Sequence, residues 1–535
     1  MNKKILWGVI ALLLILGGGY FYVNKINAQV EEIAKATLER NNITNSGVSY
    51  NCLDKTLVIK NVVFPYSDNE VKIDNSAEEI IIKGINADSF TAKSEEKALL
   101  CDEIILNKIK STVYAYGNEE LVSTTEKVSI EKPLLNLLKL IALHRTAPYS
   151  EEYFQNLLDI RHNGVKIQNV AMQAFKGSKS EASFTLKDIE LPAYSGEKFN
   201  IIYHNIDVKS TPLNFNIAEV DLKNIALPTA KYLADLSQTI MQLNALERSS
   251  DFENNPATIH EYEKLSDQLL KQLFDYPASP IIQEVKILNS AFYLNEIEEI
   301  AETPITLKEI SYLLDEDDTA LKVNSKISQL TIAKELLKDI VSPASLELFT
   351  EKFAKGIVFS FDQTDVYTKE SGEFSQDSNF SINELASLSG ETKGKFFNKD
   401  NASFFFNNNP FLYDMSFEEA EELLKNISLK SMQVSYVDSG LIDFAFKVAA
   451  NETGFPAAAL KDDILSFLQT EKQDFLENED VIGSNEIVKI IDALTETIQT
   501  TGKFMGKITL NDDISILELI ELNDIPNYTF EVSAK

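Results

Sequence analysis

The chain has 535 residues and a formal net charge of −32, from 82 acidic and 50 basic side chains. Neutralising phosphate groups needs an excess of lysine and arginine, so this balance argues against nucleic acid and against anionic lipid headgroups as partners. Aromatic residues make up 10% of the chain and only 19 residues are glycine, which is typical of folded domains and not of disordered chains.

The first predicted element is a membrane-spanning helix over Ile5–Val23, a run without a charged side chain. At 1.5 Å per residue this run just crosses a hydrocarbon layer of roughly 30 Å. Lys3 and Lys4 precede it, which places residues 1–4 in the cytoplasm and the rest of the chain outside it. The alternative is a cleaved signal peptide. The length of the run and the bulky Ile26 at the nearest cleavage candidate favour a retained anchor.

The region after the anchor is predicted to be rich in strands. The helix continues through Asn24–Glu39 with a period near 3.6 residues. Runs of β-branched and aromatic residues then indicate strands at Val48–Phe64, Glu79–Ile85 and Leu99–Leu106.

The chain has two cysteines, Cys52 and Cys101, and both lie in this strand-rich region. Outside the cytoplasm they are predicted to form a disulfide, and two buried free thiols are the alternative. Two cysteines are too few for a Cys-only zinc site, and the histidines have no ligand spacing. Asp315–Asp318 lacks the glycine and the final glutamate of a calcium loop, so we interpret it as a solvated hairpin tip. The sequence therefore predicts no metal, no cofactor and no catalytic residues.

A duplication is predicted in the middle of the chain. Val165–Met172 matches Val285–Phe292, and an L-K-[DE]-I strand follows each copy, at Leu186–Leu191 and Leu307–Tyr312. The shared spacing indicates two related units. Each copy should therefore lie in an equivalent strand and have its L-K-x-I strand as a close neighbour in the sheet.

Helices interrupt the strands from residue 229 onward. Two helical hairpins are predicted from the 3.6-residue period: Thr229–Glu247 with Ile259–Phe274, and Pro456–Leu476 with Glu486–Ile498. A helix over Ile332–Phe353 should end or kink at Ser342-Pro343. Short apolar patterns predict further strands at Ile442–Val448 and Ser515–Leu519.

The densest aromatic cluster includes Phe404, Phe406 and Phe411. Consecutive phenylalanines on a strand point to both faces of a sheet, so each face needs a cover. The cluster is interpreted as core between two layers. The alternative is an apolar groove for acyl chains or a partner protein.

These patterns predict an α+β fold with repeated antiparallel strand units and helical hairpins behind one transmembrane helix. The predicted segments are a cytoplasmic tip (1–4), the anchor (5–23), a β-rich module (24–150), a repeat unit with a helical hairpin (151–280), a second repeat unit (281–415) and a C-terminal α+β module (416–535).

The anchor, the Val48–Phe64 strand pair (VSYNCLDKTLVIKNVVF) and the short lipophilic strands with intervening helices resemble the YdgA-like bacterial envelope proteins. More loosely, the chain is similar to AsmA-type proteins. An AsmA-type resemblance implies a membrane-tethered β-sheet groove with a role in envelope lipid transport or assembly.

We therefore predict a single-pass protein of the inner membrane, with its N-terminus in the cytoplasm and its bulk in the periplasm. It is expected to be a scaffold or binding protein and not an enzyme. The expected partners are the bilayer, through Ile5–Val23, and a lipid or an envelope protein. The alternatives are a protein-binding module that takes no lipid, and a hydrolase.

Overall fold

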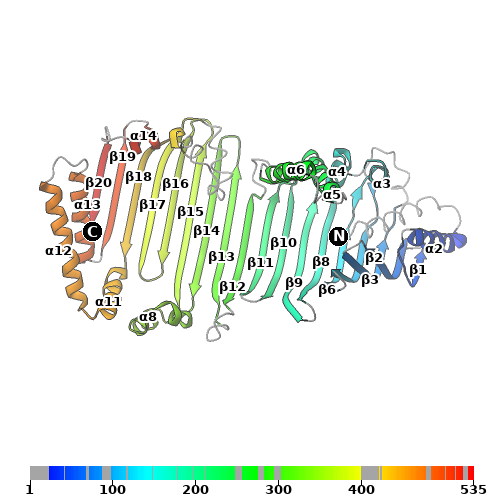
Figure 1. Ribbon diagram of the computed structural model, residues 1–535, viewed down its shortest axis with the longest axis horizontal. Helices are drawn as coiled ribbons and strands as arrows, with labels where there is room; N and C mark the ends of the chain where they lie inside the picture. The colour runs from blue at the N-terminus through cyan, green and yellow to red at the C-terminus, as the bar shows by residue number, and fades with distance from the viewer. Residues whose placement is uncertain are drawn as a thin grey trace. The chain divides into compact units, whose positions relative to one another are not determined.

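The computed structural model describes residues 23–40, 42–52, 54–67, 71–86, 98–115, 118–147, 149–176, 179–196, 198–210, 213–247, 256–274, 282–294, 303–398, 421, 424–477, 484–500, 502–511, 514–521 and 528–534. The chain divides into two compact units: unit 1 is Met1–Thr211 with Asn216–Ile282, and unit 2 is Pro212–Phe215 with Gln283–Lys535. Antiparallel sheet makes up most of the described chain and helices complete it (Figure 1), so the predicted α+β class is confirmed.

Unit 1 is organised around one antiparallel sheet. The elements as far as residue 274 are α2 (Val23–Arg40), β1 (Gly47–Asn51), β2 (Thr56–Ser67), β3 (Val71–Lys83), β4 (Ala98–Leu99), β5 (Glu103–Ala115), β6 (Asn118–Glu131), β7 (Leu134–Leu135), α3 (Leu137–Thr146), α4 (Glu151–Leu158), β8 (His162–Lys176), β9 (Lys179–Tyr194), β10 (Phe199–Ser210), β11 (Leu213–Ile225), α5 (Ala230–Glu247) and α6 (Pro256–Phe274). Neighbouring strands pair in the order β1, β2, β3, β5, β6, β8, β9, β10, and β4 pairs with β7.

Unit 2 repeats this arrangement with strands that pair in chain order. Its elements are β12 (Glu284–Leu294), β13 (Ile305–Glu316), β14 (Ala320–Ile332), η2 (Lys334–Leu336), α7 (Leu337–Ile340), α8 (Leu346–Lys352), β15 (Ile357–Thr368), β16 (Glu373–Ile382), β17 (Ala386–Phe396), β18 (Ile427–Asp438), α11 (Leu441–Thr453), α12 (Ala457–Glu477), α13 (Ser484–Thr500), β19 (Lys503–Leu510), α14 (Ile516–Glu521) and β20 (Tyr528–Ala534). Each strand from β12 to β19 is antiparallel to the next.

The predicted helical hairpins are confirmed as α5 with α6 and as α12 with α13. Two predicted strands are wrong. Ile442–Val448 lies in α11, whose first turn is capped by Asp438, and Ser515–Leu519 begins α14, where Ser515 and Glu518 exchange hydrogen bonds in a capping box. Apolar residues in runs this short fit either period, and the caps select the helix.

The predicted placement of the two matched segments is confirmed: they lie in β8 and β12, and each pairs with its L-K-x-I strand. In β8 and β9, Ile167 pairs with Ile189, and in β12 and β13 the equivalent Ile287 pairs with Ile310. Each copy also has an asparagine with positive φ at the same place, Asn169 at 50° and its equivalent at 49°. The two segments therefore share both their pairing and a local backbone irregularity.

A row of exposed polar residues, which we call the polar row, crosses the unit 1 sheet. Lys60 pairs with Glu79 and Val62 with Ala77, but Asn61 and Glu78, which lie between them, are not in register as a pair. The equivalent two residues are left out of the register between each further pair of neighbouring strands as far as β10. The alternation of side chains shifts by one residue here, so the same face stays apolar on both sides of the row. The members of the polar row are Asn61, Glu78, Lys108, Glu126, Asn169, Lys187 and Asn205.

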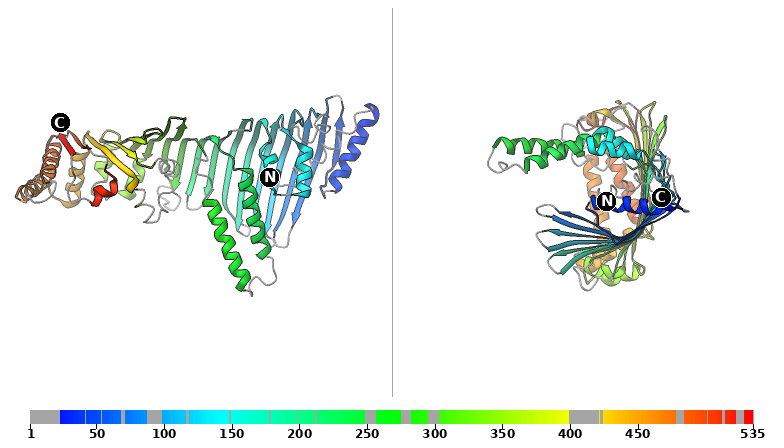
Figure 2. Two further views of the ribbon diagram at one scale, coloured as in Figure 1. Left: turned by 90° about the horizontal axis from the view of Figure 1, so that it is seen from above. Right: turned by 90° about the vertical axis from the view of Figure 1, so that its right-hand side faces the viewer.

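Helices cover the apolar face of the unit 1 sheet most completely at its first strands. Ala34 and Leu38 of α2 and Leu140 of α3 are buried against β1–β5. One cross-strand row of directly paired side chains runs from Ile59 on β2 to Tyr203 on β10, and from β6 onward its members, such as Ile167 and Ile189, are only half-buried. The α5–α6 hairpin projects away from the sheet (Figure 2).

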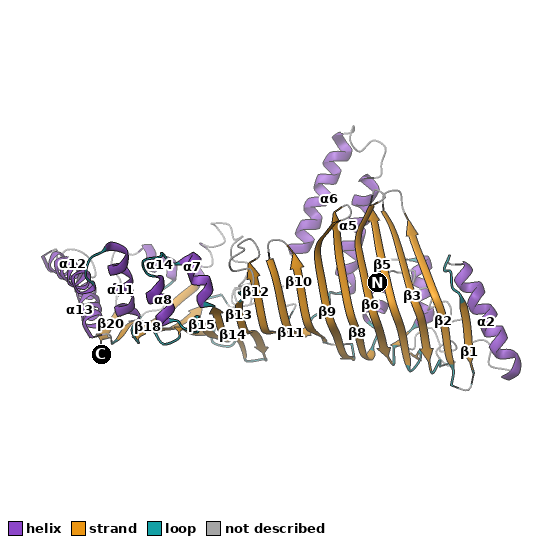
Figure 3. Ribbon diagram, turned by 90° about the horizontal axis from the view of Figure 1, so that it is seen from below, coloured by secondary structure: helices purple, strands orange, loops and turns teal. Residues whose placement is uncertain are grey.

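Helix α2 also protects the edge of the sheet. It lies beside β1 (Figure 3), and the Glu31 carboxylate accepts a hydrogen bond from the Tyr50 backbone N–H at 3.0 Å. An uncovered edge strand invites pairing with another chain, and a charged side chain bonded to it blocks that pairing.

The predicted anchor, Ile5–Val23, lies outside the described residues except for its last residue, which begins α2. Among the residues that the structure describes, no helix has the length and apolar character needed to cross a membrane.

The structure does not contain the predicted disulfide: Cys52 and Cys101 are free thiols. Cys101 is fully buried among the apolar side chains of the unit 1 core, whereas Cys52 is half-buried in the turn after β1. Burial raises the pKa of the Cys101 thiol to about 12, and the nearby Asp102 carboxylate acts in the same direction.

Native protein treated with a maleimide at pH 8 should therefore be modified at Cys52 and not at Cys101, because the reactive species is an accessible thiolate. In urea both thiols should react, as read by mass spectrometry of tryptic peptides. Protection of both thiols in urea without a reductant would instead reveal the disulfide.

Candidate functional site: an apolar row and pocket in unit 2

Eight apolar side chains form one continuous row across the unit 2 sheet, which we call the apolar row. Each pairs directly with the next across neighbouring strands, so all point to the same face. None of the eight is buried, and Phe380 and Leu388 are 39% and 45% exposed. At about 4.8 Å between strands the row is roughly 34 Å long. Its members are Ile287, Ile310, Ile327, Phe361, Phe380, Leu388, Tyr436 and Phe504.

An apolar pocket of about 390 Å³ adjoins this row. Two helices, α8 and α11, and the paired ends of β15 and β16 line it. Phe359 connects the two features, because it lines the pocket while its ring stacks on that of Phe380 in the apolar row, 6.2 Å between centroids. The residues around the pocket are Phe349, Phe353, Ile357, Phe359, Ile382, Leu385, Leu441, Phe444, Ala445, Val448 and Ala449.

Aromatic contacts hold the two helices together at the pocket. The ring of Phe444 on α11 packs edge-on against Phe349 and Phe353 of the α8 segment, at 4.9 and 5.4 Å between centroids. The start of α11 is fixed by Asp438, whose carboxylate accepts hydrogen bonds from the backbone N–H groups of Gly440 and Ile442. These contacts pre-form the pocket, which limits the entropy cost of filling it.

The other end of α11 is tied to the turn before α8. The Glu452 carboxylate accepts hydrogen bonds from the hydroxyls of Ser342 and Ser345, and these bonds lower its pKa. The Asn451 side chain donates to the backbone oxygen of Ala344 at 3.1 Å. Both ends of the helix that lines the pocket are therefore anchored by polar contacts, and its middle is left apolar.

A buried carboxylate lies on the same face of the sheet as the apolar row. Asp365 is 4% exposed and accepts hydrogen bonds from the side-chain amides of Gln363 and Gln376, at 2.8 and 2.9 Å. Burial raises the pKa of Asp365 above its ordinary value, while the two amide hydrogen bonds act in the opposite direction. The folded state consequently favours the neutral acid.

This raised pKa makes a prediction for stability against pH. An acid with a raised folded pKa stabilises the fold fully below its ordinary pKa, near 3.8, and this contribution is lost as pH rises through the folded value. Replacing Asp365 by asparagine should remove the loss. The free energy of unfolding of the variant, relative to the natural chain, should therefore increase between pH 4 and pH 7. Each tenfold weakening of the acid by folding corresponds to about 1.4 kcal/mol of this increase.

Urea denaturation at both pH values measures this difference. Asp362→Asn removes the same formal charge from an exposed position of the same strand and is the matched control. Identical pH profiles for the two variants would contradict the prediction.

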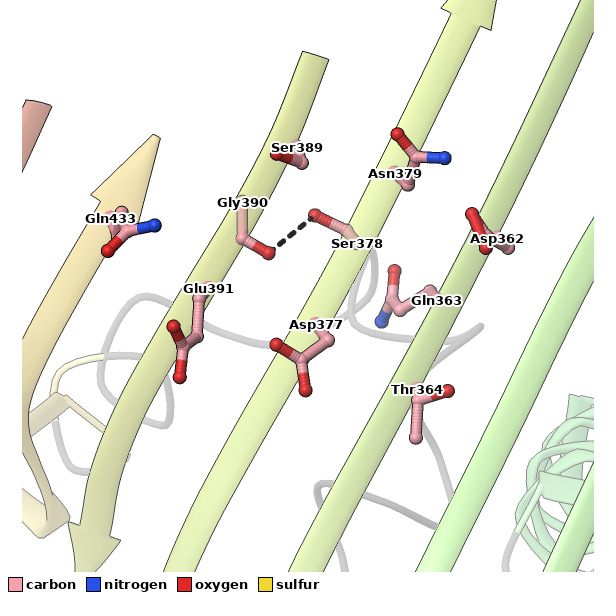
Figure 4. Close-up of a pocket in the computed structure, with 10 residues that line it drawn as sticks. All are labelled: Asp362, Gln363, Thr364, Asp377, Ser378, Asn379, Ser389, Gly390, Glu391 and Gln433. Atoms are coloured by element: carbon pink, nitrogen blue, oxygen red, sulfur yellow. Dashed lines mark hydrogen bonds between the residues drawn. The ribbon is translucent and has the colours of Figure 1, made fainter. Parts of the chain in front are cut away.

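The opposite face of the unit 2 sheet carries a polar hollow of about 300 Å³ (Figure 4). Residues of four neighbouring strands, β15 to β18, line it. The hydroxyl of Ser378 donates to the Gly390 backbone oxygen at 3.5 Å. In the part of the chain that the structure describes, no group of three or more His, Cys, Asp or Glu side chains is placed to hold a metal ion. The carboxylate, amide and hydroxyl groups that line the hollow can form hydrogen bonds with water.

Phe404, Phe406 and Phe411, which were interpreted as core with an apolar groove as the alternative, lie outside the described residues. The structure does describe the acidic run at Asp315–Asp318, and it forms the tip of the β13–β14 hairpin as predicted. There the Asp317 carboxylate accepts hydrogen bonds from Thr319 and Ala320, which lower its pKa.

The apolar row and the pocket were not predicted from the sequence. The row consists of single side chains from eight strands, so its only sequence signal is an apolar residue at one register position of each strand. A scan of protein-family models finds no match to this chain, and a search of curated proteins finds none either.

Proposed function

We propose that the protein is a membrane-anchored envelope protein that binds the acyl chain of a lipid on unit 2. The observation that carries this proposal is the half-exposed apolar row leading to an apolar pocket. The pocket volume of about 390 Å³ lies within the range of small-molecule sites. A bilayer core of roughly 30 Å holds two acyl chains end to end, so a row of roughly 34 Å is long enough for at least one.

An acyl chain suits this site better than a polar ligand does. All eleven residues that line the pocket are apolar, so they offer a polar ligand no side-chain hydrogen bond to replace those it loses with water. A lipid would also leave its headgroup in water above the open part of the row. The envelope location rests on the predicted anchor at Ile5–Val23 and on the resemblance to YdgA-like and AsmA-type proteins.

A protein partner that takes no lipid is the second candidate, because exposed apolar side chains such as Phe380 and Leu388 also suit a protein interface. The pocket favours the lipid, since a flat protein surface would not fill it.

Binding of a fluorescent fatty acid to the full-length protein in nanodiscs tests the proposal. Phe380→Asp should weaken binding at least tenfold, because it places a carboxylate on the apolar row, and it should change the melting temperature little, because the ring is 39% exposed. Ala449→Trp, which fills the pocket, should have the same effect on binding. Native mass spectrometry should detect a co-purified lipid on the natural chain and less of it on both variants.

Leu313→Asp is the matched control. Leu313 is 40% exposed and lies three residues after Ile310 of the apolar row on the same strand. Because side chains alternate along a strand, it points to the opposite face of the sheet. Binding unchanged in Phe380→Asp and Ala449→Trp would refute the proposal, as would an equal loss in Leu313→Asp.

A further inference from the structure

We propose that the outer face of α12 is a docking surface for an amphipathic helix of a partner protein, one whose apolar side chains are flanked by lysine or arginine. This surface is distinct from the apolar row and its pocket, and the proposal does not depend on lipid binding.

Large apolar side chains are exposed along α12. Ile464 and Phe467, 44% and 61% exposed, are three residues apart, and the half-buried Leu460 lies four residues before Ile464, so the three share one face of the helix. Phe455, just before the helix, is 63% exposed. The helix packs on α11 and α13, and α13 lies between α12 and β20 (Figure 1). The exposed face is therefore not the side that completes the fold.

The same face is negatively charged. Asp463 and Glu471 lie four residues before and four residues after Phe467, next to it on the helix surface. Both lysines of α12 are already engaged: Lys461 lies 3.7 Å from Asp443, and Lys472 lies 2.6 Å from Asp492. Among the described residues, Asp463 and Glu471 have no such ion pair.

These features select the occupant by charge. A second copy of this chain would bring the same acidic surface to the contact, and its net charge of −32 opposes self-association. A bilayer with anionic headgroups is repelled for the same reason. A helix with apolar residues at i and i+3 and with basic flanks satisfies both the exposed rings and the carboxylates.

A labelled leucine–lysine amphipathic peptide of about 18 residues, five turns of helix, provides the probe, and a leucine–glutamate peptide with the same apolar face is its counterpart. In fluorescence anisotropy with the full-length protein in amphipol, the lysine peptide should bind and the glutamate peptide should not. Phe467→Ser should weaken binding of the lysine peptide at least tenfold. Asp463→Asn with Glu471→Gln should do the same, although it leaves the apolar side chains in place.

Leu313→Ser is the matched control and should leave binding unchanged. It changes an exposed apolar side chain on the face of β13 opposite the apolar row. Equal binding by the natural chain and Phe467→Ser would overturn the proposal. So would sedimentation analysis showing a dimer that Phe467→Ser dissociates, because a second copy would then be the occupant. Binding to phosphatidylcholine vesicles that depends on Phe467 would instead identify a membrane as the occupant and would equally overturn it.

Discussion

Replacing Ile80 by aspartate is expected to unfold unit 1, whereas replacing Ile189 by aspartate is expected to leave it folded. The two side chains lie in one cross-strand row of the same sheet, which runs from Ile59 on β2 to Tyr203 on β10 through directly paired residues. Ile80 is 1% exposed beneath the helices, while Ile189 is half-buried beyond them. A carboxylate at residue 80 would be buried without a partner, which costs several kcal/mol out of a typical stability of about 5–15 kcal/mol.

At residue 189 the new carboxylate can reach water, so the expected loss is about 1 kcal/mol. Urea denaturation of each full-length variant, followed by hydrogen exchange of peptides from β2–β5, separates the two outcomes. Equal destabilisation would show that the face of β6–β10 is covered as well. If neither variant unfolds the unit, the helices do not exclude water from the core.

The second large effect is expected at Gly356, between α8 and β15. Its φ is +90°, and a Cβ atom there would overlap the backbone oxygen of Ile332 and lie 3.2 Å from the Cα atom of Ala333. Both neighbours are backbone atoms, which cannot rotate away. Gly356→Ala should therefore cost about 3 kcal/mol or more, the sum of a left-handed backbone and a clash.

Gly454, at the C-terminal end of α11, is the matched control. Its φ is +76°, but nothing lies within 4 Å of a Cβ atom there, so alanine should cost only about 1–2 kcal/mol for the left-handed conformation. The variants also differ in function. Gly356→Ala displaces Ile357, which lines the pocket, so fatty-acid binding should fall, while Gly454→Ala should bind normally. Similar losses of stability in both variants would contradict this account.

Local patterns in the sequence predicted the elements whose signals are local. The α5–α6 and α12–α13 hairpins carry long stripes with a period of 3.6 residues, and the strands carry β-branched runs. The duplicated strands were predicted from a match of eight residues, and even their pairing partners followed from it. Strand predictions from short apolar runs were wrong. In Ile442–Val448 the Asp438 carboxylate, which lies outside the run, accepts a hydrogen bond from the Ile442 backbone N–H and so favours a helix.

The polar row shows why alternation alone misreads these strands. In Ile59–Phe64 the buried residues are Ile59, Val62 and Phe64, a spacing of three and then two. The left-handed backbone of Asn61 accommodates the extra residue. Glu78, the exposed residue opposite it on β3, is also left out of the strand register. A strict period of two breaks at this point, and only the pairing of neighbouring strands shows that the face continues.

The sequence by itself determined the composition, the α+β class, the long helices and the pairing of each matched segment with its L-K-x-I strand, because each depends on residues close together in the chain. The candidate site depends on residues far apart. The apolar row joins side chains from Ile287 to Phe504, and the pocket joins α8 to α11 across nearly one hundred residues of chain. Which side chains share a face is set by strand register, and which of them stay uncovered is set by where the helices end. Tertiary structure alone decides both.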